Sequence, residues 1–254
     1  MKRLITHGLV ILMATLLFGC STNAPLRTLY YQADNPTRGK NMIIFLRGRG
    51  GSHEDFADEG FVEAVRERLM PVDMAAPNAH FGYYMGETLI PRLKEDVIEP
   101  ARRDGYEHFW LVGVSMGGLG ALLYAREHPD DVAGVYVISP FLGWPSILNE
   151  INETGGLMNW DPGPYDADKD WQRMFWHWLQ QGAAGNRELP LLYLGYGTED
   201  PYLTGQALLA TILPADRVFA IPGNHTAKTM RELWLIFLDQ DGFYLDRQST
   251  AKTP

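Results

Sequence analysis

The chain has 254 residues, of which 46% are hydrophobic and 21% charged, with a formal net charge of −9 and a single cysteine. This composition indicates a globular chain of one domain or two small ones, and it excludes collagen-like, coiled-coil and disordered proteins. The acidic balance argues against nucleic acid as a partner, because that binding depends on Lys and Arg. One cysteine excludes an internal disulfide and any multi-cysteine metal site.

Residues 1–19 predict a secretory signal peptide. Lys2 and Arg3 precede a mostly apolar run over 8–18, which is shorter than the ~20 residues of a membrane-spanning helix. The run ends in Leu17-Phe18-Gly19-Cys20, which resembles the lipobox of bacterial lipoproteins. The alternative is an ordinary signal peptide in which Cys20 has no role.

The lipobox resemblance implies that Cys20 is acylated and becomes the N-terminus. Removal of 19 residues would leave 235, and the loss of Lys2 and Arg3 would take the net charge from −9 to −11. The lipid would hold the protein to a membrane of the bacterial cell envelope, on the periplasmic face or in the outer membrane. Residues 20–40 would then comprise the lipidated N-terminus, a tether and a first strand region.

Short apolar runs alternate with helical patterns through the rest of the chain. Runs buried on both faces and separated by helices are typical of a mostly parallel sheet covered on both sides, so the predicted fold class is α/β. The predicted strands are 42–46, 72–76, 109–114, 132–138, 191–194 and 218–221, and the clearest predicted helices are 56–69, 87–101 and 116–126.

One long insertion, 141–188, interrupts this alternation inside the predicted domain 41–254. It becomes rich in aromatic residues at Trp171, Phe175, Trp176 and Trp178. Long connections in α/β domains tend to be lids or binding loops. The aromatic part is equally consistent with a helix that packs on the core, and both interpretations hold if that helix roofs a pocket.

The strongest chemical signal is Gly113-Val114-Ser115-Met116-Gly117-Gly118, between the predicted strand 109–114 and the predicted helix 116–126. A serine nucleophile has to be presented on a tight turn where a base can reach it. Such a strand–turn–helix elbow requires small residues two before and two after the serine, and glycines stand at both positions.

This arrangement resembles the α/β-hydrolase superfamily, especially its small serine carboxylesterases, over about 41–238. The resemblance implies a nucleophile, an acid and a histidine in that chain order. Asp200, in Gly197-Thr198-Glu199-Asp200-Pro201, matches the acid, with neighbouring Glu199 as the alternative. His225, in Pro222-Gly223-Asn224-His225, matches the histidine.

The family also implies two backbone donors for the oxyanion of an acyl-transfer reaction. One is the N–H of Met116, the residue after the nucleophile. The other belongs to the loop Arg47-Gly48-Arg49-Gly50-Gly51-Ser52, where Arg49 matches by position and Gly50 is an alternative. Arg47 stands where the family commonly has histidine. Arg47 or Arg49 could favour anionic substrates, or Arg47 could pair with a structural acid.

The resemblance therefore implies a serine hydrolase that cleaves small carboxylic esters through an acyl-enzyme, without a metal or cofactor. A peptidase or acyltransferase using the same triad remains an alternative, as does a non-catalytic lipoprotein that keeps the fold as a binding scaffold. The sequence leaves the natural substrate and the oligomeric state open.

Overall fold

The computed structural model describes residues 24–35 and 39–240, so the predicted signal peptide and Cys20 lie outside the described residues. Seven strands form one sheet in the order β1-β3-β2-β4-β5-β6-β7, and every neighbouring pair is parallel except β1 with β3. The strands are β1 (Thr28–Tyr31), β2 (Asn41–Leu46), β3 (Val72–Pro77), β4 (His108–Val114), β5 (Val132–Ile138), β6 (Leu192–Gly197) and β7 (Val218–Ile221).

The sheet has a hydrophobic core on each face, and strand β2 shows why. All six of its residues are buried. Because side chains alternate along a strand, Met42, Ile44 and Leu46 enter one core while Ile43 and Phe45 enter the other. The predicted two-sided burial of the strands is therefore confirmed.

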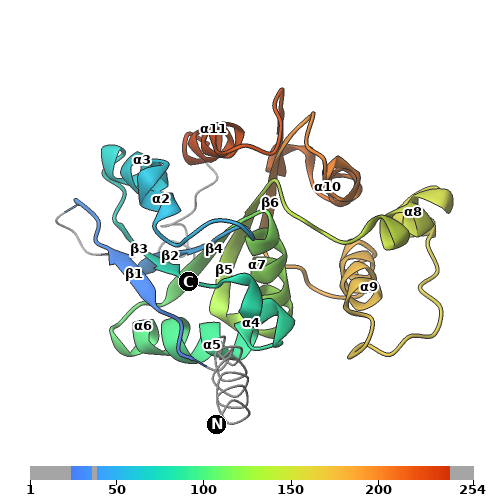
Figure 1. Ribbon diagram of the computed structural model, residues 1–254, viewed down its shortest axis with the longest axis horizontal. Coiled ribbons are helices and arrows are strands. Elements are labelled where there is room, and N and C mark those ends of the chain that lie inside the picture. The colour runs from blue at the N-terminus through green and yellow to red at the C-terminus, as the bar shows by residue number, and fades with distance from the viewer. Residues whose placement is uncertain (1–23, 36–38, 241–254) are drawn as a thin grey trace, which may run out of the picture.

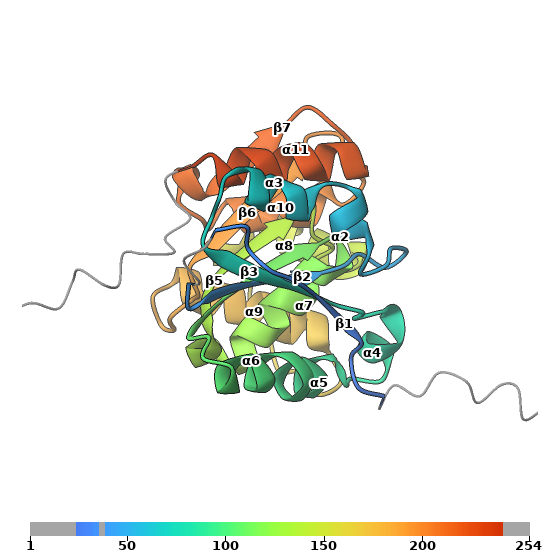
Figure 2. The same cartoon turned by 90° about the vertical axis from the view of Figure 1, so that its left-hand side faces the viewer.

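Two groups of helices cover these faces, and Figure 2 shows the sheet between α3 and α11 on one side and α5 and α6 on the other. The first face is covered by α2 (Asp55–Asp58), α3 (Phe61–Glu67) and α11 (Ala227–Leu238). The opposite face carries α4 (Phe81–Met85), α5 (Leu89–Leu93), the π-helical turn η1 (Lys94–Ile98), α6 (Glu99–Arg103), α7 (Met116–Glu127) and α10 (Leu203–Ala210). Short 3-10 turns are η2 (Pro129–Asp131) and η4 (Ala215–Arg217).

Two of the predicted helices are less regular than expected. The helix predicted over 56–69 is divided into α2 and α3 because Gly60 adopts φ +79°, a left-handed conformation that ends a helix. The helix predicted over 87–101 begins at Leu89 and widens into η1. Pro100 follows this widened turn and has no N–H to continue the α-helical hydrogen bonds.

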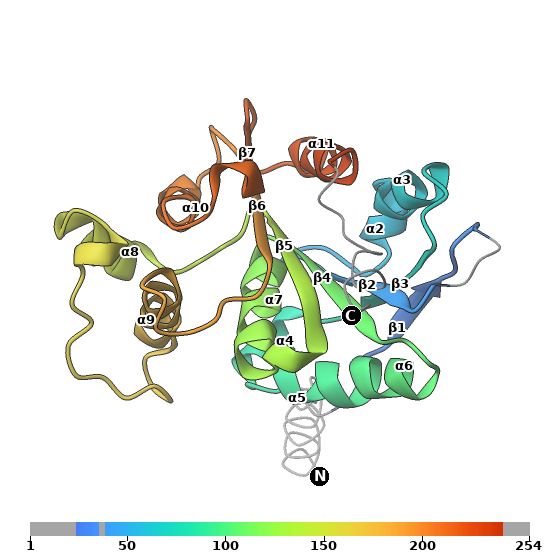
Figure 3. The ribbon, with the colours of Figure 1, turned by 180° about the vertical axis from the view of Figure 1, so that it is seen from behind.

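The insertion 141–188 forms α8 (Pro145–Glu153), the 3-10 turn η3 (Leu157–Asn159) and α9 (Trp171–Ala183). Figures 1 and 3 show α8 and α9 beside the sheet, on the side away from α2 and α3. Trp176 is fully buried and its Nε1 donates to the Leu142 carbonyl at 2.9 Å. The aromatic segment is thus a packed helix, and none of its residues lines the pocket described below.

No helix within 24–35 and 39–240 is both long and apolar enough to cross a membrane.

Candidate active site

Ser115 lies in a sharp turn between β4 and α7, with φ +55° and ψ −117°. This left-handed conformation is unusual for a residue with a side chain and is typical of strain kept at a functional site. The flanking glycines make the turn sterically feasible. A Cβ on Gly113 would lie 2.3 Å from the Gly117 carbonyl oxygen, and one on Gly117 would lie 2.0 Å from the Leu46 carbonyl oxygen.

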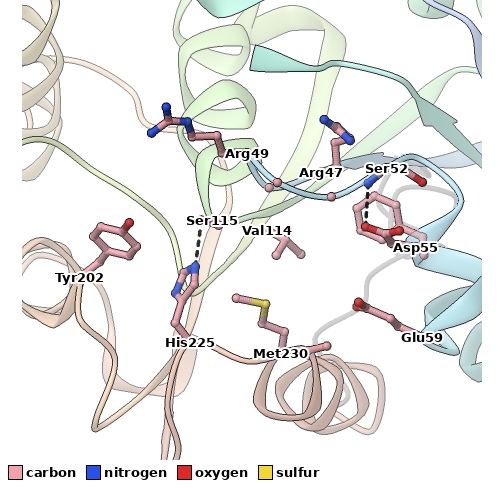
Figure 4. A pocket seen from close by; sticks show the side chains of 15 residues that line it. Arg47, Arg49, Ser52, Asp55, Glu59, Val114, Ser115, Tyr202, His225 and Met230 are labelled. Carbon is pink, nitrogen blue, oxygen red and sulfur yellow. Dashed lines mark hydrogen bonds between the residues drawn. The ribbon is translucent and has the colours of Figure 1, made fainter.

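Hydrogen bonds link the three residues that the sequence predicted as a triad. His225 Nε2 lies 3.0 Å from Ser115 Oγ, and His225 Nδ1 lies 2.8 Å from Asp200 Oδ2. Figure 4 shows the imidazole directed at the serine. The partners come from loops that follow different parallel strands, whose carboxyl ends meet at one edge of the sheet.

The loops that carry Asp200 and His225 are held together by their backbones. The N–H of Glu199 donates to the Gly223 carbonyl at 2.8 Å. A Cβ on Gly197 would come within 2.4 Å of that same carbonyl oxygen, so the close approach requires glycine. These contacts fix the separation between the acid and the histidine.

Asp200 is only 4% exposed and is the carboxylate that faces His225, whereas Glu199 is exposed. Its second oxygen, Oδ1, accepts the backbone N–H of Tyr202 at 2.9 Å. Burial opposes ionisation of Asp200, but the hydrogen bonds from His225 and Tyr202 outweigh it and hold the pKa of this carboxyl below its usual value. The acid is therefore ionised at neutral pH.

The expected oxyanion donors lie on the two segments that flank Ser115. Met116 is the first residue of α7, so its N–H has no partner within the helix. The loop 47–52 follows β2 and passes beside the serine: a Cβ on Gly48 would lie 3.3 Å from Ser115 Cβ. The donor roles of Met116 and Arg49 stay predictions.

A pocket of about 290 Å³ opens next to Ser115 and His225. Figure 4 shows that Arg47 and Arg49 extend from one side of the loop 47–52, while Asp55, Glu59 and Met230 lie on the other side. The pocket is lined by Arg47, Gly48, Arg49, Gly50, Gly51, Ser52, Asp55, Phe56, Glu59, Val114, Ser115, Tyr202, His225, Ala227 and Met230.

The two arginines have different surroundings, and the expected preference for anionic substrates stays a prediction. The Arg49 guanidinium lies over the Phe81 ring, 4.5 Å from its centroid. Arg47 Nε is buried without a hydrogen-bond partner among the described residues, and burial lowers the pKa of this guanidinium despite the nearby charge of Asp55.

Several lining residues were not predicted from the sequence. Tyr202 follows the acid by two positions, and its ring lies 5.0 Å from that of His225. Met230 lies in the first turn of α11, beyond the histidine. Asp55 and Glu59 follow the predicted oxyanion loop and are four positions apart in the sequence. Residues at this spacing are neighbours on a helical surface, so the spacing could have predicted that the two carboxylates lie together. No group of three His, Cys, Asp or Glu side chains in the described part of the chain could hold a metal ion.

Comparisons with known proteins show the family and the fold of this chain. Residues 16–218 match the family model described as "Putative esterase". "Putative esterase NocK" from Nocardia uniformis subsp. tsuyamanensis is 30% identical over 138 residues, which cover 47% of this chain and 38% of that protein. "Proline iminopeptidase" from Clostridioides difficile is 23% identical over 176 residues, 63% of this chain and 58% of that protein. The chain thus spans less than two thirds of the length of either curated relative.

Among solved structures, the S-formylglutathione hydrolase FrmB of Staphylococcus aureus superposes with a TM-score of 0.55 at 13% identity. The match covers 84% of this chain and 94% of that one. At this identity the likeness concerns the fold, and it confirms the predicted α/β-hydrolase architecture.

Proposed function

We propose that this chain, which belongs to the esterase family that its sequence matches over 16–218, hydrolyses carboxylic esters through an acyl-enzyme formed on Ser115. The observation that carries the proposal is the hydrogen-bonded series Ser115 Oγ, His225 Nε2, His225 Nδ1 and Asp200 Oδ2, with separations of 3.0 and 2.8 Å. This geometry supports a serine nucleophile with its general base and an ionised acid.

In the acylation step, His225 Nε2 takes the Ser115 hydroxyl proton while Oγ forms a bond to the ester carbonyl carbon. Asp200 accepts the Nδ1 proton and stabilises the imidazolium that results. The C–O bond to the alcohol then breaks, and the departing oxygen takes the proton back from Nε2. In the deacylation step, water gives a proton to His225 Nε2 and attacks the acyl carbon. The bond to Ser115 Oγ then breaks, Oγ takes the proton back, and the carboxylic acid is released.

The negative charge on the carbonyl oxygen is stabilised by the N–H groups of Met116 and Arg49. One such donor contributes on the order of 3 kcal/mol to the transition state of serine hydrolases. The proposal is supported by the strained turn at Ser115, which lies at the N-terminus of α7, where the Met116 N–H has no partner within the helix.

The test is to react the purified protein with a fluorophosphonate probe and with p-nitrophenyl acetate and butyrate. Ser115→Ala should abolish both labelling and turnover. The matched control is Ser146→Ala, which changes an exposed serine at the start of α8 and should leave both intact. Labelling that persists in Ser115→Ala would refute the nucleophile assignment, and a wild-type protein that neither labels nor turns over would favour the scaffold alternative.

The same assay separates the related activities. A peptidase would release p-nitroaniline from proline p-nitroanilide, the class of substrate that the name of the Clostridioides difficile relative suggests. An acyltransferase would form a new ester when a second alcohol is added. For an esterase we expect hydrolysis of the esters to exceed both reactions.

We also propose that the protein is exported and carries a lipid on Cys20, which attaches it to the bacterial cell envelope. The support is the segment Leu17-Phe18-Gly19-Cys20 after a short apolar run. Metabolic labelling with an alkyne palmitate analogue should mark the membrane fraction of cells that express the whole chain. Cys20→Ser should lose the label, and labelling that survives this change would refute the assignment.

A further inference from the structure

The pocket beside Ser115 is lined by apolar side chains, by two carboxylates, Asp55 and Glu59, and by the loop 47–52 with its two arginines. Phe56 and Met230 are 4% and 7% exposed and, with Val114, form the apolar part of the lining. Figure 4 shows the Glu59 carboxylate directed into the pocket near Asp55, on the opposite side of Val114 and Met230 from His225. A group attached to the reacting ester can therefore extend from Ser115 toward two carboxylates.

The two carboxylates do not have the same surroundings. Asp55 Oδ2 accepts the N–H of Ser52 at 2.7 Å, and Asp55 also interacts electrostatically with Arg47. Glu59 has no ion pair with any residue in 24–35 or 39–240. Burial, followed by repulsion from Asp55 and Asp58, raises the pKa of Glu59, as expected for a carboxylate without a compensating cation. Of the two carboxylates in the lining, Glu59 is therefore the one without a nearby cation.

A charge of this kind discriminates between substrates by sign. A cationic nitrogen that reaches the Glu59 carboxylate would pair with it and be partly desolvated between apolar walls, where Coulomb attraction is stronger than in water. A carboxylate at the same position would be repelled. The arginines of the loop 47–52 do not pair with Glu59: Arg47 interacts with Asp55, and the Arg49 guanidinium lies over the Phe81 ring.

We propose that Glu59 is a specificity-determining residue and that this pocket selects esters carrying a positively charged nitrogen a few bonds from the reacting carbonyl. The proposal rests on the ester hydrolysis proposed above. It specifies the substrate class of the same site.

The experiment compares matched esters of nearly equal shape and different charge. On the acyl side these are the p-nitrophenyl esters of 4-(trimethylammonio)butanoate, 5,5-dimethylhexanoate and glutarate, which are cationic, neutral and anionic. On the alcohol side choline butyrate is compared with 3,3-dimethylbutyl butyrate. We expect kcat/KM to favour the cation over the neutral ester by about tenfold on at least one side, and the preference should fall as added salt screens the charges.

Two variants of the whole chain then test whether the carboxylate of Glu59 causes the preference for the cationic ester. Glu59→Gln keeps the shape of the side chain and should lower the cation-to-neutral ratio at least about threefold. The matched control is Asp58→Asn, which removes the same formal charge from an exposed neighbour outside the pocket lining and should leave the ratio within about twofold. A wild-type ratio of one or less on both sides would overturn the proposal, and so would a preference that is unchanged in Glu59→Gln.

A binding measurement separates this proposal from the proposed activity. Calorimetric titration of the Ser115→Ala protein with choline butyrate and 3,3-dimethylbutyl butyrate reports the charge preference without turnover. Tighter binding of the cation, weakened by adding Glu59→Gln, would support the pocket assignment even if the wild-type protein hydrolysed none of the esters. Equal binding of both esters would overturn the assignment even if the protein proved to be an efficient esterase.

Discussion

Replacing Asp200 with Asn should nearly abolish activity without changing the shape of the site. Asp200 Oδ1 accepts the Tyr202 N–H at 2.9 Å, so the carbonyl oxygen of the new amide has to occupy that position. Its NH2 group then takes the place of Oδ2, 2.8 Å from His225 Nδ1. Two donors cannot face each other, so Nδ1 must become the acceptor and the imidazole proton must move to Nε2. A protonated Nε2 cannot take the proton from Ser115.

The expected loss in kcat is about 10³- to 10⁴-fold, which corresponds to ~4–5.5 kcal/mol of transition-state stabilisation. The assay is steady-state hydrolysis of p-nitrophenyl butyrate at neutral pH, with KM and the thermal unfolding midpoint measured alongside. Glu199→Gln is the control, since it also replaces a carboxylate with an amide, at the exposed neighbouring residue. This variant should retain most of the activity. The reasoning is refuted if Asp200→Asn keeps more than a tenth of the activity, or if Glu199→Gln loses as much.

Two further outcomes are expected. Gly117→Ala places a Cβ 2.0 Å from the Leu46 carbonyl oxygen and should reduce esterase activity by displacing the loop after β2, with a stability loss of about 1–3 kcal/mol in urea unfolding. Asp131 accepts hydrogen bonds from Lys94 at 2.6 Å and Arg102 at 2.8 Å, so Asp131→Asn should cost about 2 kcal/mol at pH 7. Burial opposes ionisation of Asp131, but its hydrogen bonds hold the pKa of this carboxyl below the usual value for aspartate. The ionised side chain therefore stabilises the fold at any pH above the usual pKa, and the stabilisation is lost as acid protonates Asp131 in the folded protein. The difference in stability between wild type and Asp131→Asn should shrink toward pH 3.

The sequence pattern predicted the central strands because they are buried on both faces and carry nearly continuous apolar residues. β1 is short and its residues are only partly buried, so the sequence indicated no more than a strand region. The course of the predicted helices was less accurate, since a left-handed glycine at position 60 interrupts the first and a π-helical turn before Pro100 widens the second. Periodicity does not register such local backbone effects.

The order and loop context of Ser115, Asp200 and His225 predicted residues that the structure brings within hydrogen-bond distance. The character of the pocket was harder to predict. From their position in the chain, Arg47 and Arg49 suggested an anionic substrate or, for Arg47, pairing with an acid. Position alone does not say which side of a loop a side chain takes. The position of the two carboxylates depends on the left-handed backbone of Gly60 and on the hydrogen bond that joins Asp55 of α2 to Ser52 of that loop, and residue type alone predicts neither.

The hydrogen bond between Ser115 and His225 joins residues 110 positions apart, and the acid and the histidine both come from loops next to the last strands of the sheet. Activity should therefore appear only after the last strands have joined the sheet. A refolding chain can form the central strands and bury its first tryptophans before it has any esterase activity. During refolding, esterase activity should recover later than tryptophan fluorescence. The delay between the two signals would measure the time that β7 and α11 take to pack onto the rest of the protein.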